Sequence, residues 1–261
     1  MDNFYYNAVG KTPLVQLTDR IWAKLETYNP TGSIKDRLVH YVANVSKRRG
    51  LLRAGMTLVE ATSGNTGIAL SAYGAANGHV VKIIMPKNMS EERKQMMRLF
   101  GAEIIEVGES DFEGAIALRD KMVEENSGYF SPKQFSNPDN VECHEWTTGM
   151  EIKRQLIGLG EEKIAAIVSG AGTGGTIMGT KRAMEKFVDQ EAPKFVMVMP
   201  AEGKVHGIQG IGDGGDYLVN RDEIDETIDI STEDAIESAK KLAREQGLFV
   251  GISAGANVLA A

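Results

Sequence analysis

The sequence contains very little cysteine and no long apolar run. Its one cysteine, Cys143, cannot form an intramolecular disulfide, so a disulfide-stapled fold is excluded and a reducing cytoplasm is indicated. No apolar stretch approaches the roughly 20 residues of a membrane span. The first seven residues lack the charged start and apolar middle of a signal peptide. We therefore expect a cytoplasmic protein without a membrane partner.

Two other absences narrow the function. The four histidines show no metal-ligand spacing, so we expect no metal site. Lys and Arg number 29 against 36 Asp and Glu, which gives a formal net charge of −7. A duplex binder needs a basic face, and here the basic residues are scattered among acids, so we expect no nucleic-acid partner.

The sequence has the composition of an ordinary globular protein, with apolar and amphipathic segments that alternate regularly. The chain of 261 residues is long enough for one large or two modest domains. Short apolar segments alternate with amphipathic ones, which predicts an α/β protein with mostly parallel sheets. The expected strands are 21–25, 57–60, 80–85, 103–107, 165–169, 195–199 and 249–252. The expected helices are 35–49, 66–77, 90–100, 112–125, 141–155, 176–187 and 232–246.

Ligands of open α/β sheets bind beyond the carboxyl ends of the strands, so the strand-to-helix turns are the first places to search. Residues 60–67 and 169–176 form two such turns, both rich in glycine and hydroxyl side chains. Small residues let the backbone approach a ligand, and the N–H groups at a helix start attract anions. The second turn suits a phosphate, and the first suits a carboxylate.

Another interpretation of the second turn is a dinucleotide site. Gly170, Gly172 and Gly175 fit the pattern G-x-G-x-x-G, and Glu202 follows the next expected strand. This weak pattern would make the protein a nicotinamide-dependent oxidoreductase. It would leave the preceding half of the chain unexplained.

Lys35 favours a different chemistry. It lies in the segment 29–37, whose Pro-Thr-Gly turn makes Ser33 a candidate helix cap and puts Lys35 in the first helical turn. The positive end of the helix dipole there favours a neutral amine, which a lysine needs in order to react with a carbonyl group. Alone, Lys35 would be read as a surface lysine paired with Asp36.

Together these motifs resemble the cysteine synthase (O-acetylserine sulfhydrylase) family of fold-type II pyridoxal-5′-phosphate (PLP) enzymes. Four of them stand in the family's order: Gly10–Leu14, Asn29–Arg37, Thr62–Gly67 and Gly172–Thr176. A fifth, Gly251–Gly255, lies near the C-terminus, so the likeness covers nearly the whole chain.

The resemblance implies a fold like that of tryptophan synthase β, with two open, twisted, mostly parallel sheets flanked by helices. It implies a smaller domain at 38–137, which carries the substrate loop, and a larger domain made of 1–37 with 138–261. The family usually continues beyond the position of Ala261, so we expect less of the larger domain's outer layer to form.

The resemblance also implies roles for individual residues. Lys35 would be the catalytic residue and would hold the cofactor covalently, Asn65 would bond its ring hydroxyl, and Ser253 would face its pyridine nitrogen. The phosphate would be bound by Gly172, Thr173, Gly174, Gly175 and Thr176. The substrate carboxylate would be bound by Thr62, Ser63, Thr66 and Gln134.

The implied reaction is PLP-dependent β-replacement, in which an activated serine, O-acetyl-L-serine, and sulfide form L-cysteine through an aminoacrylate. A serine at the pyridine nitrogen does not force its protonation, which favours β-elimination. The family also implies a homodimer and a serine acetyltransferase partner. The leaving group (acetyl or phosphoryl) and the sulfur source (sulfide or thiosulfate) stay open. A serine or threonine dehydratase and a non-catalytic binding protein are the further alternatives.

Overall fold

The computed structural model describes residues 4–62, 64–161, 163–187, 192–203, 205–212 and 217–261. The chain forms two compact units. The first unit contains Met1–Gly10 and Glu26–Asp139, and the second contains Lys11–Leu25 and Asn140–Ala261. This division groups Lys35 with the first unit. The domain boundaries expected from the resemblance, at 38 and 137, stay a prediction.

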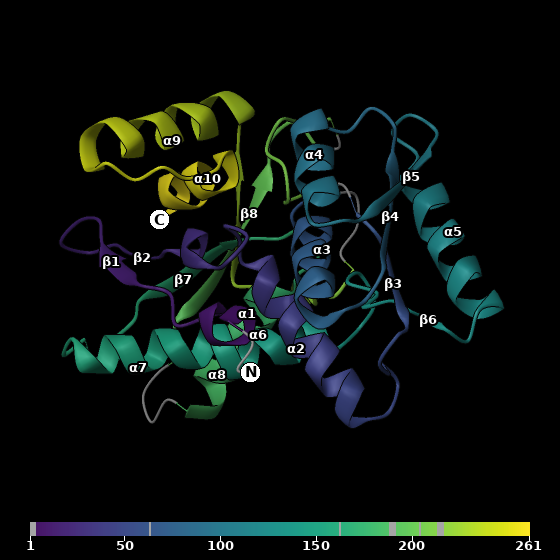
Figure 1. Ribbon diagram of the computed structural model, residues 1–261. Coiled ribbons are helices and arrows are strands. Elements are labelled where there is room, and N and C mark those ends of the chain that lie inside the picture. The colour runs from purple at the N-terminus through teal and green to yellow at the C-terminus, as the bar shows by residue number, and fades with distance from the viewer. Residues whose placement is uncertain (1–3, 63, 162, 188–191, 204, 213–216) are drawn as a thin grey trace. The chain divides into compact units, whose positions relative to one another are not determined.

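The first unit is built on a parallel sheet in the strand order β5-β4-β3-β6. Its strands are β3 (Thr57–Ala61), β4 (Val81–Pro86), β5 (Glu103–Val107) and β6 (Tyr129–Phe130). Its helices are α1 (Phe4–Ala8), α2 (Lys35–Arg48), α3 (Asn65–Asn77), α4 (Glu91–Leu99) and α5 (Phe112–Glu125), with a 3₁₀ turn at Glu26–Tyr28. Helices α3 and α4 lie on one side of the sheet and α5 lies on the other (Figure 1).

The second unit is built on a parallel sheet in the order β7-β8-β9. Its strands are β7 (Ala166–Gly170), β8 (Lys194–Pro200) and β9 (Glu226–Ile230), and an antiparallel pair is formed by β1 (Leu14–Gln16) and β2 (Trp22–Lys24). Its helices are α7 (Met150–Gly158), α8 (Gly175–Phe187), α9 (Thr232–Gln246) and α10 (Ile252–Ala260), with a 3₁₀ turn at Arg221–Glu223. Helix α6 (Asp139–His144) continues through a π-helical turn, Glu145–Gly149, into α7. Helices α9 and α10 pack on each other beside the sheet (Figure 1).

The buried faces follow the sequence pattern. In the first unit, Leu58 of β3 and Ile83 of β4 are fully buried against Tyr73 of α3 and Met97 of α4. Strands buried on both faces have near-continuous apolar sequences, and in β4 only Lys82 interrupts the apolar run. Helix α3 is rich in small residues, and a side chain at Gly67 would lie 2.7 Å from the methyl of Met97. This close approach lets α3 and α4 share one layer.

The expected alternation of strands and helices is confirmed, with specific corrections. Residues 249–252 do not form a strand, because Ile252 begins α10 and the residues before it are irregular. The expected helix at 141–155 is interrupted by the π-helical turn. The sequence did not predict the short elements α1, β1, β6 and α10, or the strand β9, which carries the acidic residues Glu226 and Asp229. Along the described parts of the chain, no helix is long and apolar enough to cross a membrane.

Candidate active site

The predicted cofactor lysine stands at the start of a helix. Lys35 is the first residue of α2 and is partly buried. The expectation that Ser33 caps this helix is wrong in detail. The cap position is Ile34, and the Ser33 hydroxyl instead accepts a hydrogen bond of 3.3 Å from the Lys35 N–H. The Pro-Thr-Gly turn still precedes the helix, with Gly32 in the left-handed region (φ 80°).

Asp36, the neighbour of Lys35, is fully buried and fixes the turn. Its carboxylate accepts hydrogen bonds from the Tyr5 hydroxyl at 2.8 Å, the Thr31 N–H at 3.0 Å and the Thr31 hydroxyl at 2.8 Å. Burial raises the pKa of the Asp36 carboxyl, and the bonds from Thr31 and Tyr5 oppose that rise. Asp36 therefore holds the turn through its bonds to Thr31 and Tyr5.

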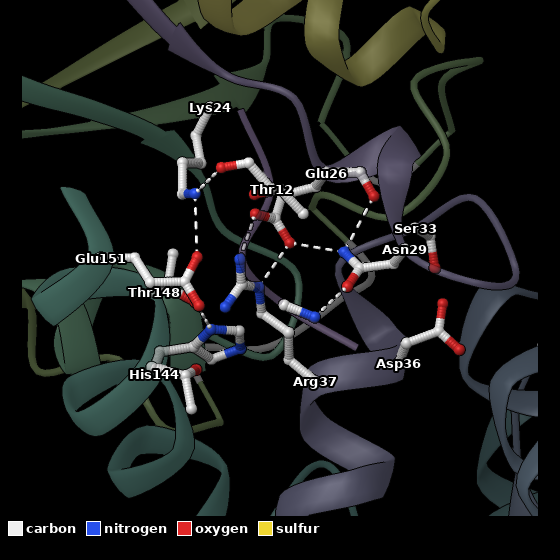
Figure 2. Close-up of polar contacts among 12 residues, drawn as sticks. Thr12, Lys24, Glu26, Asn29, Ser33, Asp36, Arg37, His144, Thr148 and Glu151 are labelled. Atoms are coloured by element: carbon white, nitrogen blue, oxygen red, sulfur yellow. Dashed lines mark hydrogen bonds and ion pairs between the residues drawn. The ribbon is translucent and has the colours of Figure 1, made fainter. Parts of the chain in front are cut away.

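A second acid anchors the other side of the turn. The Arg37 guanidinium makes two bonds to Glu26, at 2.6 Å and 2.9 Å, and the Arg37 side chain is 1% exposed (Figure 2). Asn29 donates to Glu26 at 2.8 Å and accepts from the Gly10 N–H at 2.9 Å. A bidentate arginine pair is geometrically specific, so the backbone on both sides of Lys35 is held.

The motif that begins at Gly10 has a structural role in the second unit. The Lys11 N–H donates to Glu151 of α7 at 2.9 Å, and Gln155 donates to the Thr12 carbonyl at 2.9 Å. Lys24 of β2 bonds the Thr12 carbonyl and pairs with Glu151 at 2.9 Å (Figure 2). The motif thus ties the β1-β2 pair to α7.

The predicted substrate residues converge in the first unit. The turn from β3 to α3 begins at Thr62, whose hydroxyl accepts from the Gly64 N–H at 3.3 Å, and Asn65 is the first residue of α3. The Thr66 hydroxyl donates to the Gln134 side chain at 2.6 Å, and both residues are buried. Asn65 is exposed, and Ser63 lies outside the described residues.

The predicted phosphate loop forms the start of α8 in the second unit. Gly174 has a left-handed backbone (φ 87°), and a side chain there would lie 2.4 Å from Val219. A side chain at Gly175 would lie 2.1 Å from the amide oxygen of Asn140. Gly172, Thr173 and Thr176 are partly buried. The loop therefore requires glycine at two positions and offers helix-start N–H groups beside two hydroxyls, which is an anion-binding arrangement.

Helix α6 holds both threonines of this loop. Asn140 donates to the Thr173 hydroxyl at 3.0 Å. One turn later, the His144 Nε2 lies 3.4 Å from the Thr176 hydroxyl, and its Nδ1 lies 2.8 Å from the Thr148 hydroxyl (Figure 2 shows the latter pair). Asn140 was not predicted as a site residue, and no role was predicted for His144. Asn140 immediately precedes the expected helix 141–155 and stands four residues before His144, and this spacing was the available signal.

Ser253 lies in the first turn of α10 and is partly buried. One turn later on the same helix, Asn257 accepts a hydrogen bond of 2.7 Å from the Gly170 N–H at the end of β7. This bond ties the helix that carries Ser253 to the strand that leads into the phosphate loop. Asn257 is a second residue that the sequence analysis missed.

The dinucleotide interpretation is not supported by the position of Glu202. Its carboxylate accepts a bond of 2.6 Å from the Thr232 N–H at the start of α9. That bond lowers the pKa of Glu202. Glu202 therefore serves a helix start, where an acid also complements the dipole.

Within each unit the structure brings specific predicted residues together. In the first unit, Thr66 bonds Gln134, and Lys35 and Asn65 begin the two packed helices α2 and α3. In the second unit, Thr173 and Thr176 share one loop supported by α6. The predicted residues are distributed over both units, and their joint use stays a prediction.

Comparison with known proteins adds independent findings. Residues 5–261 match the family model described as pyridoxal-phosphate dependent enzyme. A cysteine synthase of Staphylococcus aureus is 37% identical over 97% of this chain and 85% of its own length. Cysteine synthase B of Salmonella typhimurium is 40% identical over 99% of this chain and 86% of its own length. The crystal structure of cysteine synthase (OASS) from Entamoeba histolytica superposes with a TM-score of 0.88 at 37% identity, covering 100% of this chain and 81% of that one.

Proposed function

Because this chain belongs to the family of pyridoxal-phosphate dependent enzymes, we propose that it is a cysteine synthase that forms L-cysteine from O-acetyl-L-serine and sulfide. The observation that carries the proposal is a pair of strand-to-helix turns whose geometry suits ligand binding. One is a phosphate-type loop at the start of α8, and the other is a hydroxyl-rich turn at the start of α3 linked to Gln134. Both are needed for a phosphorylated cofactor and an amino-acid substrate.

The residues at the start of α8 fit the cofactor's phosphate. The approach of Val219 and Asn140 leaves no room for a side chain at Gly174 or Gly175, so the loop presents backbone N–H groups. Thr173 and Thr176 add hydroxyls that α6 orients. In the His144 tautomer that carries its proton on Nε2, the Thr176 hydroxyl accepts from His144 and can donate its own proton to a phosphate oxygen.

The bound cofactor would supply an electron sink that stabilises negative charge at the substrate Cα. Lys35 would hold the cofactor and, once the substrate amine displaces it, would remove the Cα proton as a general base. Asp36 and Arg37 restrict the turn on which Lys35 stands, so its amine starts from a fixed backbone. Ser253 would face the pyridine nitrogen and Asn65 the ring hydroxyl.

The substrate carboxylate would be bound at the start of α3. Its oxygens would be contacted by Thr62, Thr66 and Gln134, and Ser63 is assigned to the same group from the resemblance. A carboxylate at a helix N-terminus is favoured by the dipole and by the N–H groups of the first turn. Binding there would orient the substrate amine and Cα relative to the lysine.

Further assignments depend on the resemblance. We propose a cytoplasmic transferase that acts as a homodimer and binds a serine acetyltransferase. The single cysteine supports a reducing compartment. The choice of acetyl over phosphoryl leaving group is supported by the relatives named above.

The proposed function is tested by loading and substrate titration. Purified chain is incubated with PLP, reduced with borohydride and digested, and the peptide containing Lys35 is expected to carry the pyridoxyl mass. Loaded protein is then titrated with O-acetyl-L-serine followed by sulfide, and cysteine is quantified. A label on another lysine, or an absorbance unchanged by O-acetyl-L-serine, would overturn the proposal. Deamination of serine or threonine without sulfide incorporation would favour the dehydratase alternative.

A further inference from the structure

A buried ion pair lies beneath the proposed substrate turn. Glu60, near the end of β3, is fully buried, and its Oε1 lies 2.7 Å from Nη1 of Arg119 on α5. The Arg119 side chain is 3% exposed. Removing two charges from water is expensive, and a buried ion pair is weak evidence for a purely stabilising role. The pair therefore needs another explanation.

The second oxygen of Glu60 faces the segment that carries Gln134. Oε2 accepts the Gln134 N–H at 3.2 Å and lies 3.5 Å from the Ser131 hydroxyl. The side chain of Gln134 in turn accepts the Thr66 hydroxyl at 2.6 Å and donates to the Ala61 carbonyl at 3.4 Å. A continuous series of contacts thus runs from Arg119 through Glu60 and Gln134 to Thr66.

Only a carboxylate satisfies both sides of this arrangement. Arg119 and the Gln134 backbone both present N–H donors to position 60. An ionised carboxylate is acceptor-only at both oxygens, whereas an amide carries one oxygen and one NH₂ group. A glutamine here would place a donor against a donor on one side. Arg119 also balances the charge of Glu60, which would otherwise repel an anionic ligand.

We propose that Glu60, balanced by Arg119, is a positioning residue that fixes Gln134 and Thr66 in the geometry that binds the substrate carboxylate. This inference rests on the proposed function, because it needs an amino acid bound at the start of α3. It goes beyond that function by assigning carboxylate recognition to a pair that does not itself contact the ligand. Burial raises the pKa of Glu60, and the charge of Arg119 opposes that rise and favours the ionised form.

The test compares Glu60→Gln with Asp120→Asn. Asp120 bonds the Nε of the same arginine at 3.0 Å but is half exposed and is not part of the contacts to Gln134 described above. L-Alanine has no leaving group at Cβ, so its binding can be followed by the visible absorbance of PLP-loaded protein without turnover. L-Alaninamide presents the same amine without the carboxylate.

The expected result is a rise of about 10-fold or more in the dissociation constant of L-alanine for Glu60→Gln, since a buried donor is left unpaired. The constant for L-alaninamide should change by less than about 2-fold, and Asp120→Asn should leave both constants within about 2-fold. A role in stability alone would lower the urea midpoint without changing the ratio of the two constants.

Equal effects on the two ligands, or no effect on either, would overturn the inference. If Glu60→Gln does not fold, the dissociation constants of L-alanine and L-alaninamide are measured for Arg119→Lys instead. Lysine keeps the charge but loses the planar fork, so a selective rise of about 3-fold or more for L-alanine is expected, and an unchanged ratio overturns the inference. If the wild-type chain responds to no amino acid, the proposed function itself fails, and that outcome is seen before any variant is compared.

Discussion

Asn140 donates a hydrogen bond of 3.0 Å to the hydroxyl of Thr173, across 33 positions of the sequence. The same amide side chain occupies the space that any side chain at Gly175 would need. One residue of α6 therefore both orients a hydroxyl of the phosphate-type loop and enforces glycine in it. This double contact makes the loop sensitive to a single added methyl group.

Gly175→Ala should weaken cofactor binding. The new methyl would lie 2.1 Å from the Asn140 amide oxygen, so the helix start or Asn140 must move. Overpacking of this kind costs about 1–3 kcal/mol, which corresponds to about 5- to 150-fold in affinity for PLP. Equilibrium dialysis with PLP measures the effect. Gly158→Ala in the same unit meets nothing within 4 Å and should bind PLP as the wild type does. Equal affinities for all three proteins would contradict the assignment of the loop.

Lys35→Ala should abolish covalent attachment of the cofactor and lower the rate of cysteine formation by about 10²–10⁴-fold, the usual contribution of a general base. Borohydride reduction followed by peptide mass mapping checks the first effect, and a stopped assay of cysteine checks the second. Lys47→Ala, which changes a lysine in the last turn of the same helix, is the control and should retain attachment at Lys35. Normal turnover by Lys35→Ala would exclude the proposed role.

Thr66→Val should raise KM for O-acetyl-L-serine more than it lowers kcat. The substitution keeps the shape of the side chain and removes the hydrogen bond of 2.6 Å that the buried Gln134 side chain accepts from Thr66. The loss of such a bond costs about 1–3 kcal/mol, or roughly 5- to 150-fold in KM. Steady-state kinetics at saturating sulfide separate the two constants. A change confined to kcat would argue against a role in binding.

Asp36→Asn should change how stability depends on pH. Burial raises the pKa of Asp36 in the folded protein above its ordinary value, so the folded state holds this proton more tightly than the unfolded chain does. The contribution of Asp36 to the free energy of unfolding is therefore greatest below 3.8, the pKa of this group in the unfolded chain. This contribution falls as the pH rises through the pKa of Asp36 in the folded protein.

The measurement for Asp36 is urea unfolding of wild type and Asp36→Asn at several pH values. The difference in unfolding free energy, wild type minus variant, should decrease from acid to neutral pH and then level off. Titrations of other groups cancel in this difference. An increase toward neutral pH would mean that the bonds from Thr31 and Tyr5 outweigh burial.

Much of the fold could be predicted because its signals are local. The apolar run of β4, the small-residue helix after Thr62 and the cap at Ser231 of α9 each depend on residues within a few positions. The cap is a contact between residues three apart, in which the Ser231 hydroxyl accepts from the Asp234 N–H at 3.1 Å. The prediction of a strand at 249–252 was wrong, because a short apolar run does not distinguish a strand from a connector before a helix.

The sequence by itself determined where chemistry could lie, because turns, glycines and helix starts are set by backbone preferences of neighbouring residues. It placed Lys35 at a helix start and Thr176 in a glycine-rich loop, and both positions hold in the structure. Only the tertiary structure decided what supports them. Gln134 meets Thr66 across 68 positions, and Arg119 meets Glu60 across 59. Such pairs depend on strand order and on which helix covers which face, and no local preference encodes a partner so far along the chain.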